Sequence, residues 1–178
     1  MLFSRVAVKT TKHIELEVFV TLRVVDRVAL TARQALTERL AYDDILADLK
    51  RQDYYRVAVA GEEAEALTYL RQIAANTTFF ANPNKETCAI EYVTRPLSKD
   101  NRYVALVYPR SGLFDESLRR YLAQDLGYDR VVAAGRGVAW TIELAPGVDE
   151  KYVEEILVAR ERTLGLLLNP HAEKYEIV

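Results

Sequence analysis

Apolar and polar residues alternate in two similar stretches, one near the start of the chain and one just after its midpoint. The apolar positions are Ile14, Leu16, Val18, Val20 and Leu22 in the first stretch and Val104, Leu106 and Tyr108 in the second. A period of two is typical of a strand that buries one of its faces. The pattern therefore predicts a strand in each of these places.

Two rows of apolar residues at spacings of three and four follow each strand and predict two helices in each half. The shorter row consists of Val28, Ala32, Leu36 and Leu40 in the first half and of Leu118, Leu122 and Leu126 in the second. The longer row consists of Ala66, Tyr69, Leu70, Ile73, Thr77 and Phe80 in the first half and of Val153, Ile156, Leu157, Arg160, Leu164 and Leu167 in the second. Asp115 is a suitable N-cap for the second short helix, and Gly127 a suitable end.

Two strand-like segments lie between the helices of each half. Short apolar segments surround Ile45 and Val131, and alternating triplets follow, namely Tyr55, Val57 and Val59 in the first half and Trp140, Ile142 and Leu144 in the second. In the second half Gly135-Arg136-Gly137 separates the two segments. It lacks the pattern of a phosphate-binding loop, and we interpret it as a hairpin turn.

The matching segments recur at a nearly constant offset, which indicates an internal repeat. Asn82-Pro83 aligns with Asn169-Pro170 at an offset of 87 residues, and Tyr42-Asp43 aligns with Tyr128-Asp129 at an offset of 86. Proline disfavours a helical conformation in the residue before it, so we expect Asn-Pro to end the longer helix in both halves.

Each half thus has the order strand, helix, strand, strand, helix, strand, which predicts an α+β protein built from two tandem ferredoxin-like βαββαβ units. The predicted units span residues 13–93 and 102–178, and a polar linker spans 94–101. Helices on one side of each antiparallel sheet would leave apolar residues bare on the other, among them Phe19 and Ala58. We therefore expect the two sheets to cover each other as an intramolecular pseudo-dimer.

Composition narrows the classes of partner. The chain has 178 residues, with 24 basic and 26 acidic side chains and a net charge of -2, so it lacks the positive field that gathers nucleic acid. No apolar run reaches the length that spans a bilayer, and the first ten residues lack the apolar core of a signal peptide. We expect a cytoplasmic protein with neither a membrane nor a nucleic acid as its partner.

Few side chains suggest catalysis. Cys88, the single cysteine, could act as a nucleophile only beside a base, and His13 and His171 are the only histidines. We interpret Cys88 as a core residue of the last strand of its half and His171 as a turn residue. These three residues do not form a spaced set of metal ligands, so we expect no metal site.

The remaining charged candidates have simple structural interpretations. Glu62-Glu63 and Glu154-Glu155 are adjacent on predicted helices, point about 100° apart and therefore share no site. Arg160 interrupts an apolar row, and we expect it to extend from the helix edge into solvent. We predict no catalytic, cofactor-binding or metal-binding residues and no cofactor.

The second half resembles PurS, the small accessory subunit of phosphoribosylformylglycinamidine synthase. The resemblance rests on Tyr108-Pro109-Arg110, Ser111 to Asp115, Leu126-Gly127-Tyr128, Val138 to Leu144, and Leu167-Leu168-Asn169-Pro170 with Glu173, Tyr175 and Ile177. The first half is similar to a diverged copy that keeps Asn82-Pro83 and Glu86. It lacks the glycine after its first strand and has Cys88 in place of the tyrosine.

The resemblance implies a non-catalytic scaffold in de novo purine biosynthesis. Such a subunit joins the ATP-dependent synthetase to the glutaminase that supplies ammonia, and it can form oligomers. A second hypothesis is a regulatory module that binds a small metabolite between tandem ferredoxin-like domains. A third, binding of single-stranded RNA on the sheet, requires exposed aromatic residues with basic flanks, and the sequence lacks that combination.

Overall fold

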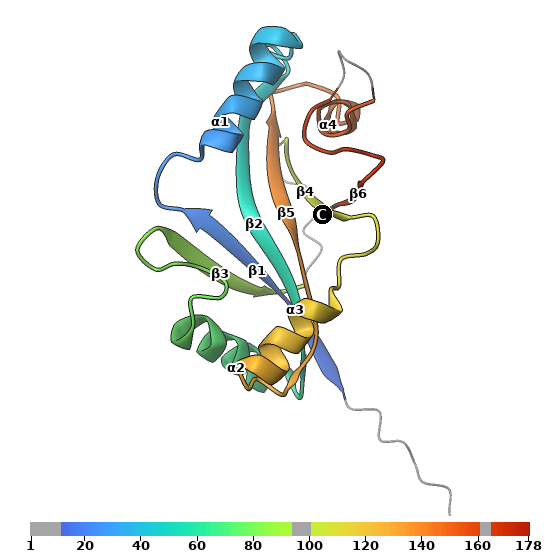
Figure 1. Ribbon diagram of the computed structural model, residues 1–178. Coiled ribbons are helices and arrows are strands. Elements are labelled where there is room, and N and C mark those ends of the chain that lie inside the picture. The colour runs from blue at the N-terminus through green and yellow to red at the C-terminus, as the bar shows by residue number, and fades with distance from the viewer. Residues whose placement is uncertain (1–11, 94–100, 161–164) are drawn as a thin grey trace, which may run out of the picture.

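The computed structural model describes residues 12–93, 101–160 and 165–178, which form one six-stranded antiparallel sheet in the order β3-β1-β2-β5-β4-β6 (Figure 1). In chain order the elements are β1 (His13–Leu22), α1 (Arg27–Gln34), η1 (Ala35–Arg39), β2 (Leu46–Ala60), α2 (Glu63–Asn76), β3 (Glu86–Tyr92), β4 (Arg102–Pro109), α3 (Glu116–Arg120), η2 (Tyr121–Asp125), β5 (Val131–Leu144), α4 (Lys151–Leu157) and β6 (Glu173–Ile177). The elements η1 and η2 are single π-helical turns. The predicted linker lies outside the described residues except for Asn101, and no described helix is long and apolar enough to span a membrane.

The predicted α+β class is confirmed, but the βαββαβ order is not, because each half contains three strands. The two segments predicted on either side of Gly135-Arg136-Gly137 are a single strand, β5, and the corresponding segments of the first half form β2. These two strands pair antiparallel along almost their whole length, from Leu46 with Leu144 to Val59 with Val131. The halves are therefore joined edge to edge in one sheet, and the expected face-to-face packing of two sheets is wrong.

The prediction of a hairpin turn at Gly135-Arg136-Gly137 is wrong, because these residues lie in the middle of β5. The two glycines instead allow other segments of the backbone to come close to the strand. A Cβ atom on Gly135 would lie 2.1 Å from the carbonyl oxygen of Leu113, and one on Gly137 would lie 2.3 Å from that of Val107. The loop before α3 can lie directly on the strand for this reason. Phe114 forms a bridge with Gly135, and the Asp115 amide donates to the Ala134 oxygen at 2.8 Å.

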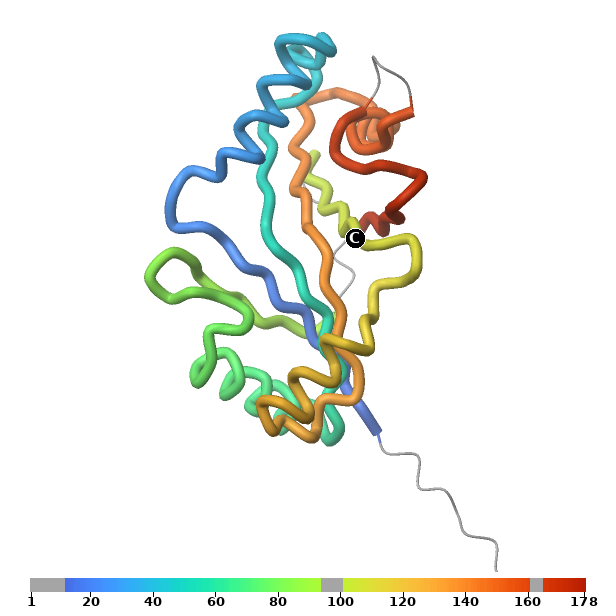
Figure 2. Tube along the Cα trace, in the orientation of Figure 1, coloured from blue at the N-terminus to red at the C-terminus, as the bar shows by residue number. Residues whose placement is uncertain are grey.

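Two hydrophobic cores lie on one face of the sheet, and each draws on both halves of the chain. One core combines residues of α1 and η1 with residues of α4, including Ala32, Leu36, Ile156 and Leu157. The other combines α2 with η2, including Leu70, Ile73 and Leu122. Figure 2 shows β2 and β5 running side by side from the α1 and α4 end to the α2 and α3 end. Neither half has a core made of its own residues alone.

The first strand of the first half, β1, buries the face that the sequence predicts, whereas the first strand of the second half, β4, does not. Leu16, Val18 and Val20 lie in a helix-side core as expected. In β4, by contrast, Ala105 and Val107 face the helices, whereas Leu106 lies on the other side of the sheet. An error of one position reverses the faces of a strand, and β4 is apolar on both faces, so its alternation is ambiguous.

The second short helix begins at Asp115, as the sequence predicts, and the first begins at an equivalent aspartate for which no prediction was made. The Asp115 carboxylate accepts a hydrogen bond from the Ser117 amide at 2.9 Å, and Asp26 caps α1 by accepting from Val28 and Ala29. Gly127, with φ of 80°, follows the π-helical turn that continues α3. A π-helical turn, which places one extra residue in a helical turn, occurs at the equivalent place after α1.

The prediction that Asn-Pro ends the longer helices is wrong, because α2 ends at Asn76 and α4 at Leu157. Asn-Pro instead starts a turn before the last strand of each half. The Asn82 side chain accepts from the Asn84 amide at 3.0 Å, and the Glu86 carboxylate accepts from the Asn82 amide at 2.7 Å. The second half repeats both bonds through Asn169 and Glu173, at 3.0 and 2.8 Å. The repeat in the sequence thus encodes a turn in which two side chains satisfy backbone amides.

An arginine at the end of the first strand fixes this turn in both halves. The Arg23 amide donates to the Lys85 oxygen, and the Arg110 amide donates to the Ala172 oxygen, each at 2.8 Å. Their guanidinium groups add bonds to the carbonyl oxygens of Glu86 and Pro170. The two halves therefore follow equivalent paths here.

Because both cores are shared, we expect the halves to be unable to fold separately. A protease site introduced between Val93 and Asn101 should give a cleaved chain that still elutes as one species from a sizing column. Each half expressed alone should show no cooperative urea unfolding by circular dichroism, since half of each core would be missing. Two folded, separable monomers would contradict the shared cores.

Replacing Gly135 by alanine should destabilise the fold by about 1–3 kcal/mol, because the new Cβ must displace the Leu113 backbone. Urea unfolding measures the change. The control is Arg136→Ala on the same strand, which removes a partly exposed side chain and should have a smaller effect. An equal loss in both variants would show that the close approach is unimportant.

Candidate functional site

The most deeply buried ionic cluster of the described residues lies on the sheet face opposite the helices. Glu17 of β1 is only 5% exposed and accepts hydrogen bonds from the Tyr54 hydroxyl at 2.7 Å and from Arg56 Nη2 at 3.0 Å. Arg56 Nε also donates to the Tyr54 hydroxyl, at 2.8 Å. Phe19 packs against Tyr54, with ring centroids 5.4 Å apart.

This cluster joins the two halves across the open face of the sheet. Arg56 Nη2 lies 3.7 Å from Glu176 Oε2 on β6, although β5 and β4 separate β2 from β6 in the strand order. Three strand spacings in a flat sheet would amount to about 14 Å. The contact therefore depends on a long arginine side chain and on a sheet that curls toward this face.

The chemistry of the cluster is structural. Burial, followed by the hydrogen bond to Glu17, raises the pKa of Tyr54 far above its usual value, so the phenol stays protonated at neutral pH. Arginine is always charged and cannot exchange a proton. Neither Tyr54 nor Arg56 is therefore poised to transfer a proton. Together with Glu17 they form a satisfied ion pair, which sequence reasoning missed because residues on alternate strand positions look solvent-exposed.

Replacing Arg56 by methionine should destabilise the chain by about 3–5 kcal/mol, because the Glu17 carboxylate would remain buried without its cation. Urea unfolding gives the value. Arg119→Met is the matched control: Arg119 pairs with Glu116 on the surface, and its loss should change the transition little. Equal stability of Arg56→Met and the unmodified chain would show that the buried pair contributes nothing.

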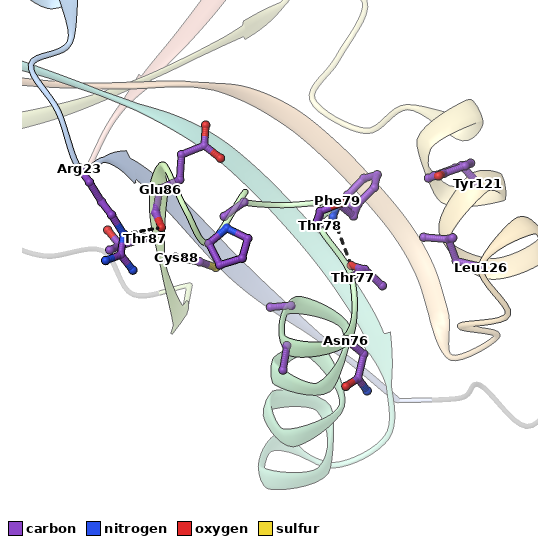
Figure 3. A pocket seen from close by; sticks show the side chains of 14 residues that line it. Arg23, Asn76, Thr77, Thr78, Phe79, Glu86, Thr87, Cys88, Tyr121 and Leu126 are labelled. Atoms are coloured by element: carbon purple, nitrogen blue, oxygen red, sulfur yellow. Dashed lines mark hydrogen bonds between the residues drawn. The ribbon is translucent and has the colours of Figure 1, made fainter.

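Cys88 is exposed on the edge strand β3, so its interpretation as a core residue is wrong. It lines an open cavity of about 970 Å³ between β3, the end of α2 and η2, where Phe79 and Tyr121 form the opposite side (Figure 3). Partial desolvation raises the pKa of its thiol, which disfavours the reactive thiolate.

His13 lies too far from Cys88 to activate it. Val20 pairs with Cys88, and His13 is seven residues further along β1, a distance of about 23 Å in an extended strand. His171 lies in the turn of the second half, as the sequence predicts, and its amide bonds to Asn169. No group of three or more metal-ligating side chains occurs among the residues that the structure describes.

The acidic pairs and Arg160 make separate surface contacts. Glu62 precedes α2 and pairs with Lys12 at 2.6 Å. Glu154 pairs with Arg160, which lies beyond the end of α4 and does not extend from its edge as predicted. The second half has Tyr175 where the first has Cys88, and together with Glu154 and Arg160 it lines a smaller cavity of about 390 Å³.

Two exposed apolar patches flank the N-caps of the short helices. The valine patch consists of Val24, Val25, Val28 and Leu30, of which the valines are 57–71% exposed. The aromatic patch consists of Phe114 and Tyr121, which are 46% and 44% exposed. Val25 and Phe114 directly precede the capping residues Asp26 and Asp115, so the two patches occupy equivalent places in the two halves. Contiguous exposed apolar patches are typical of interaction surfaces, whereas apolar residues exposed singly are common on any protein.

No protein-family model matches this chain, and no curated protein matches its sequence.

Proposed function

We propose that the chain is a non-catalytic docking protein that holds two partner proteins at opposite ends of one rigid sheet. The observation that carries the proposal is the pair of exposed apolar patches at equivalent positions of the two halves. Figure 1 places α1 and α3, which follow the patches, at opposite ends of the β2 and β5 strands. A rigid spacer with a contact surface at each end is the geometry that bridging requires.

The two patches differ in chemistry, which suits them to different partners. The valine patch is aliphatic and adjoins basic side chains such as Arg33 and Lys50. The aromatic patch presents Phe114 and Tyr121, and Tyr121 packs against Phe79 with ring centroids 5.8 Å apart. Aromatic side chains are enriched in the parts of interfaces that dominate affinity, and chemically different surfaces allow a scaffold to distinguish its partners.

The partners in this proposal follow from the resemblance to PurS: the ATP-dependent synthetase subunit and the glutaminase subunit of phosphoribosylformylglycinamidine synthase, in the cytoplasm. The turn formed by Asn169, Pro170 and Glu173 supports it, because residues quoted for the resemblance have a defined role in both halves. The proposal treats the protein as an accessory component of a ligase complex rather than as an enzyme.

Affinity purification of the tagged chain from native lysate should recover both a synthetase and a glutaminase, identified by mass spectrometry. Val25→Asp should lose one partner and Phe114→Asp the other, each by at least tenfold, because a charge placed in an apolar contact must be desolvated without a partner. Leu166→Asp is the control, since Leu166 is 45% exposed outside both patches. Recovery of neither subunit would overturn the assignment, and loss of both partners in all three variants would overturn the two-ended geometry.

A further inference from the structure

The outer edge of β2 is open along its first half. β1 pairs with β2 only from Asp53 to Ala60, so within the described chain no strand pairs with the edge of Leu46–Gln52 that faces away from β5. The loop between β1 and α1 passes this edge at a distance. A hydrogen bond of 2.7 Å from the Gln52 side chain to Thr21 marks the point where the two strands separate.

The equivalent edge of the second half is closed by its own loop. Phe114 forms a bridge with Gly135, and the Asp115 amide donates to the Ala134 oxygen. This contact needs glycine at position 135, because a Cβ atom there would lie 2.1 Å from the Leu113 oxygen. Gly137 allows a different approach, that of the Val107 carbonyl oxygen of β4. The loop of the second half therefore lies directly on the edge of β5.

The strand registers identify the residues of the first half that correspond to the two glycines. Glu86 and Glu173 are equivalent in the repeated turn and pair with Leu22 and Pro109, which makes Val20 equivalent to Val107. Val20 pairs with Asp53, and Val107 pairs with Val138. Asp53 of β2 is therefore equivalent to Val138 of β5. Counted back from this pair, Lys50 is equivalent to Gly135, and Gln52 is equivalent to Gly137.

Lys50 therefore places a side chain where the second half has Gly135, and it lines a cavity of about 370 Å³ together with residues of the loop between β1 and α1. Its lining includes four cationic residues and two acidic ones, a net charge of +2 from 4 minus 2: Arg33, Lys50, Arg51 and Arg102 with Asp26 and Asp48. Leu22, Val25 and Leu30 form an apolar wall. The cavity therefore combines an excess of positive charge with an aliphatic surface.

The acidic residues are occupied, whereas part of the positive charge is available. Asp26 caps α1 and lies 3.5 Å from Arg51, and Asp48 pairs with Lys50 at 3.1 Å. Although partial burial opposes the change, the hydrogen bond from Lys50 lowers the pKa of Asp48, which remains a carboxylate at neutral pH. The Arg102 side chain, by contrast, makes no hydrogen bond or ion pair with any described residue, and Lys50, although it pairs with Asp48, is 61% exposed.

We propose that this cavity binds a small organic anion, in which a carboxylate or phosphate head contacts Arg102 and Lys50 and a short aliphatic tail contacts Leu22, Val25 and Leu30. Arginine and lysine are the side chains that bind such heads. The volume lies at the small end of the range for ligand pockets. The cavity contains Lys50 where the second half has Gly135 and a loop packed on its strand, so the site reflects a difference between the halves and goes beyond the docking function.

Thermal unfolding of the purified chain tests the site. Isovalerate and butyl phosphate should each raise Tm above a sodium chloride control of equal ionic strength, because a ligand that binds only the folded state stabilises it. The two probes distinguish a carboxylate from a phosphate head. Inorganic phosphate and acetate, which lack the tail, should bind at least tenfold more weakly in calorimetric titrations.

Single substitutions test separately the residues that contact the anionic head of the ligand and those that contact its aliphatic tail. Arg102→Gln should weaken both tailed probes at least tenfold, whereas Arg119→Gln, which removes the same charge from α3, should not. Leu30→Ser should weaken the tailed probes and leave inorganic phosphate unchanged. No rise in Tm with either tailed probe, or equal weakening by Arg102→Gln and Arg119→Gln, would overturn the site. These measurements need no partner protein, so their outcome is independent of the docking proposal.

Discussion

The pairing of β2 with β5 is the interaction on which the rest of the structure depends. The two strands run antiparallel from Leu46 opposite Leu144 to Val59 opposite Val131, and each is long enough to serve a different core at each of its ends. Leu46 at the start of β2 and Ile156 of α4 lie in one core, whereas Val59 and Leu122 lie in the other. Without this ladder the two halves would have neither a common sheet nor complete cores.

Because the two halves share their cores, their surface residues can differ while the backbone follows the same path in both. The elements that fix the path are retained in both, namely the capping aspartates, the π-helical turns, the arginine at the end of the first strand and the turn that follows Asn-Pro. Several residues that differ lie on the edge, on the loops or on the open face. Cys88 against Tyr175 and Lys50 against Gly135 are examples, and each changes a cavity rather than a core.

The sequence predicts the class, the repeat, the helix starts and most strand positions, because period and capping are local properties. It does not predict the length of β2 and β5, because Gly135-Arg136-Gly137 is a typical hairpin sequence and its role depends on Leu113 and Val107, which are distant in the chain. The exposure of Cys88 was missed for a similar reason, since an edge strand cannot be distinguished from an inner strand by its own residues. The sequence offered no local signal for the ionic cluster, since Glu17 and Arg56 are 39 positions apart.

The centre of the open face of the sheet is buried although no second sheet of the described chain covers it. Tyr54, Leu106 and Ala139 are at most 1% exposed there, with Phe19, Val104 and Val178 packed around them. A strongly curled sheet brings side chains of distant strands together, as the contact between Arg56 and Glu176 shows. An arginine suits this position because its planar group can bond to Tyr54 and Glu17 and still lie close to β6. The apolar residues that suggested face-to-face packing are thus buried within one sheet, which leaves the ends of that sheet as the surfaces where partners can bind.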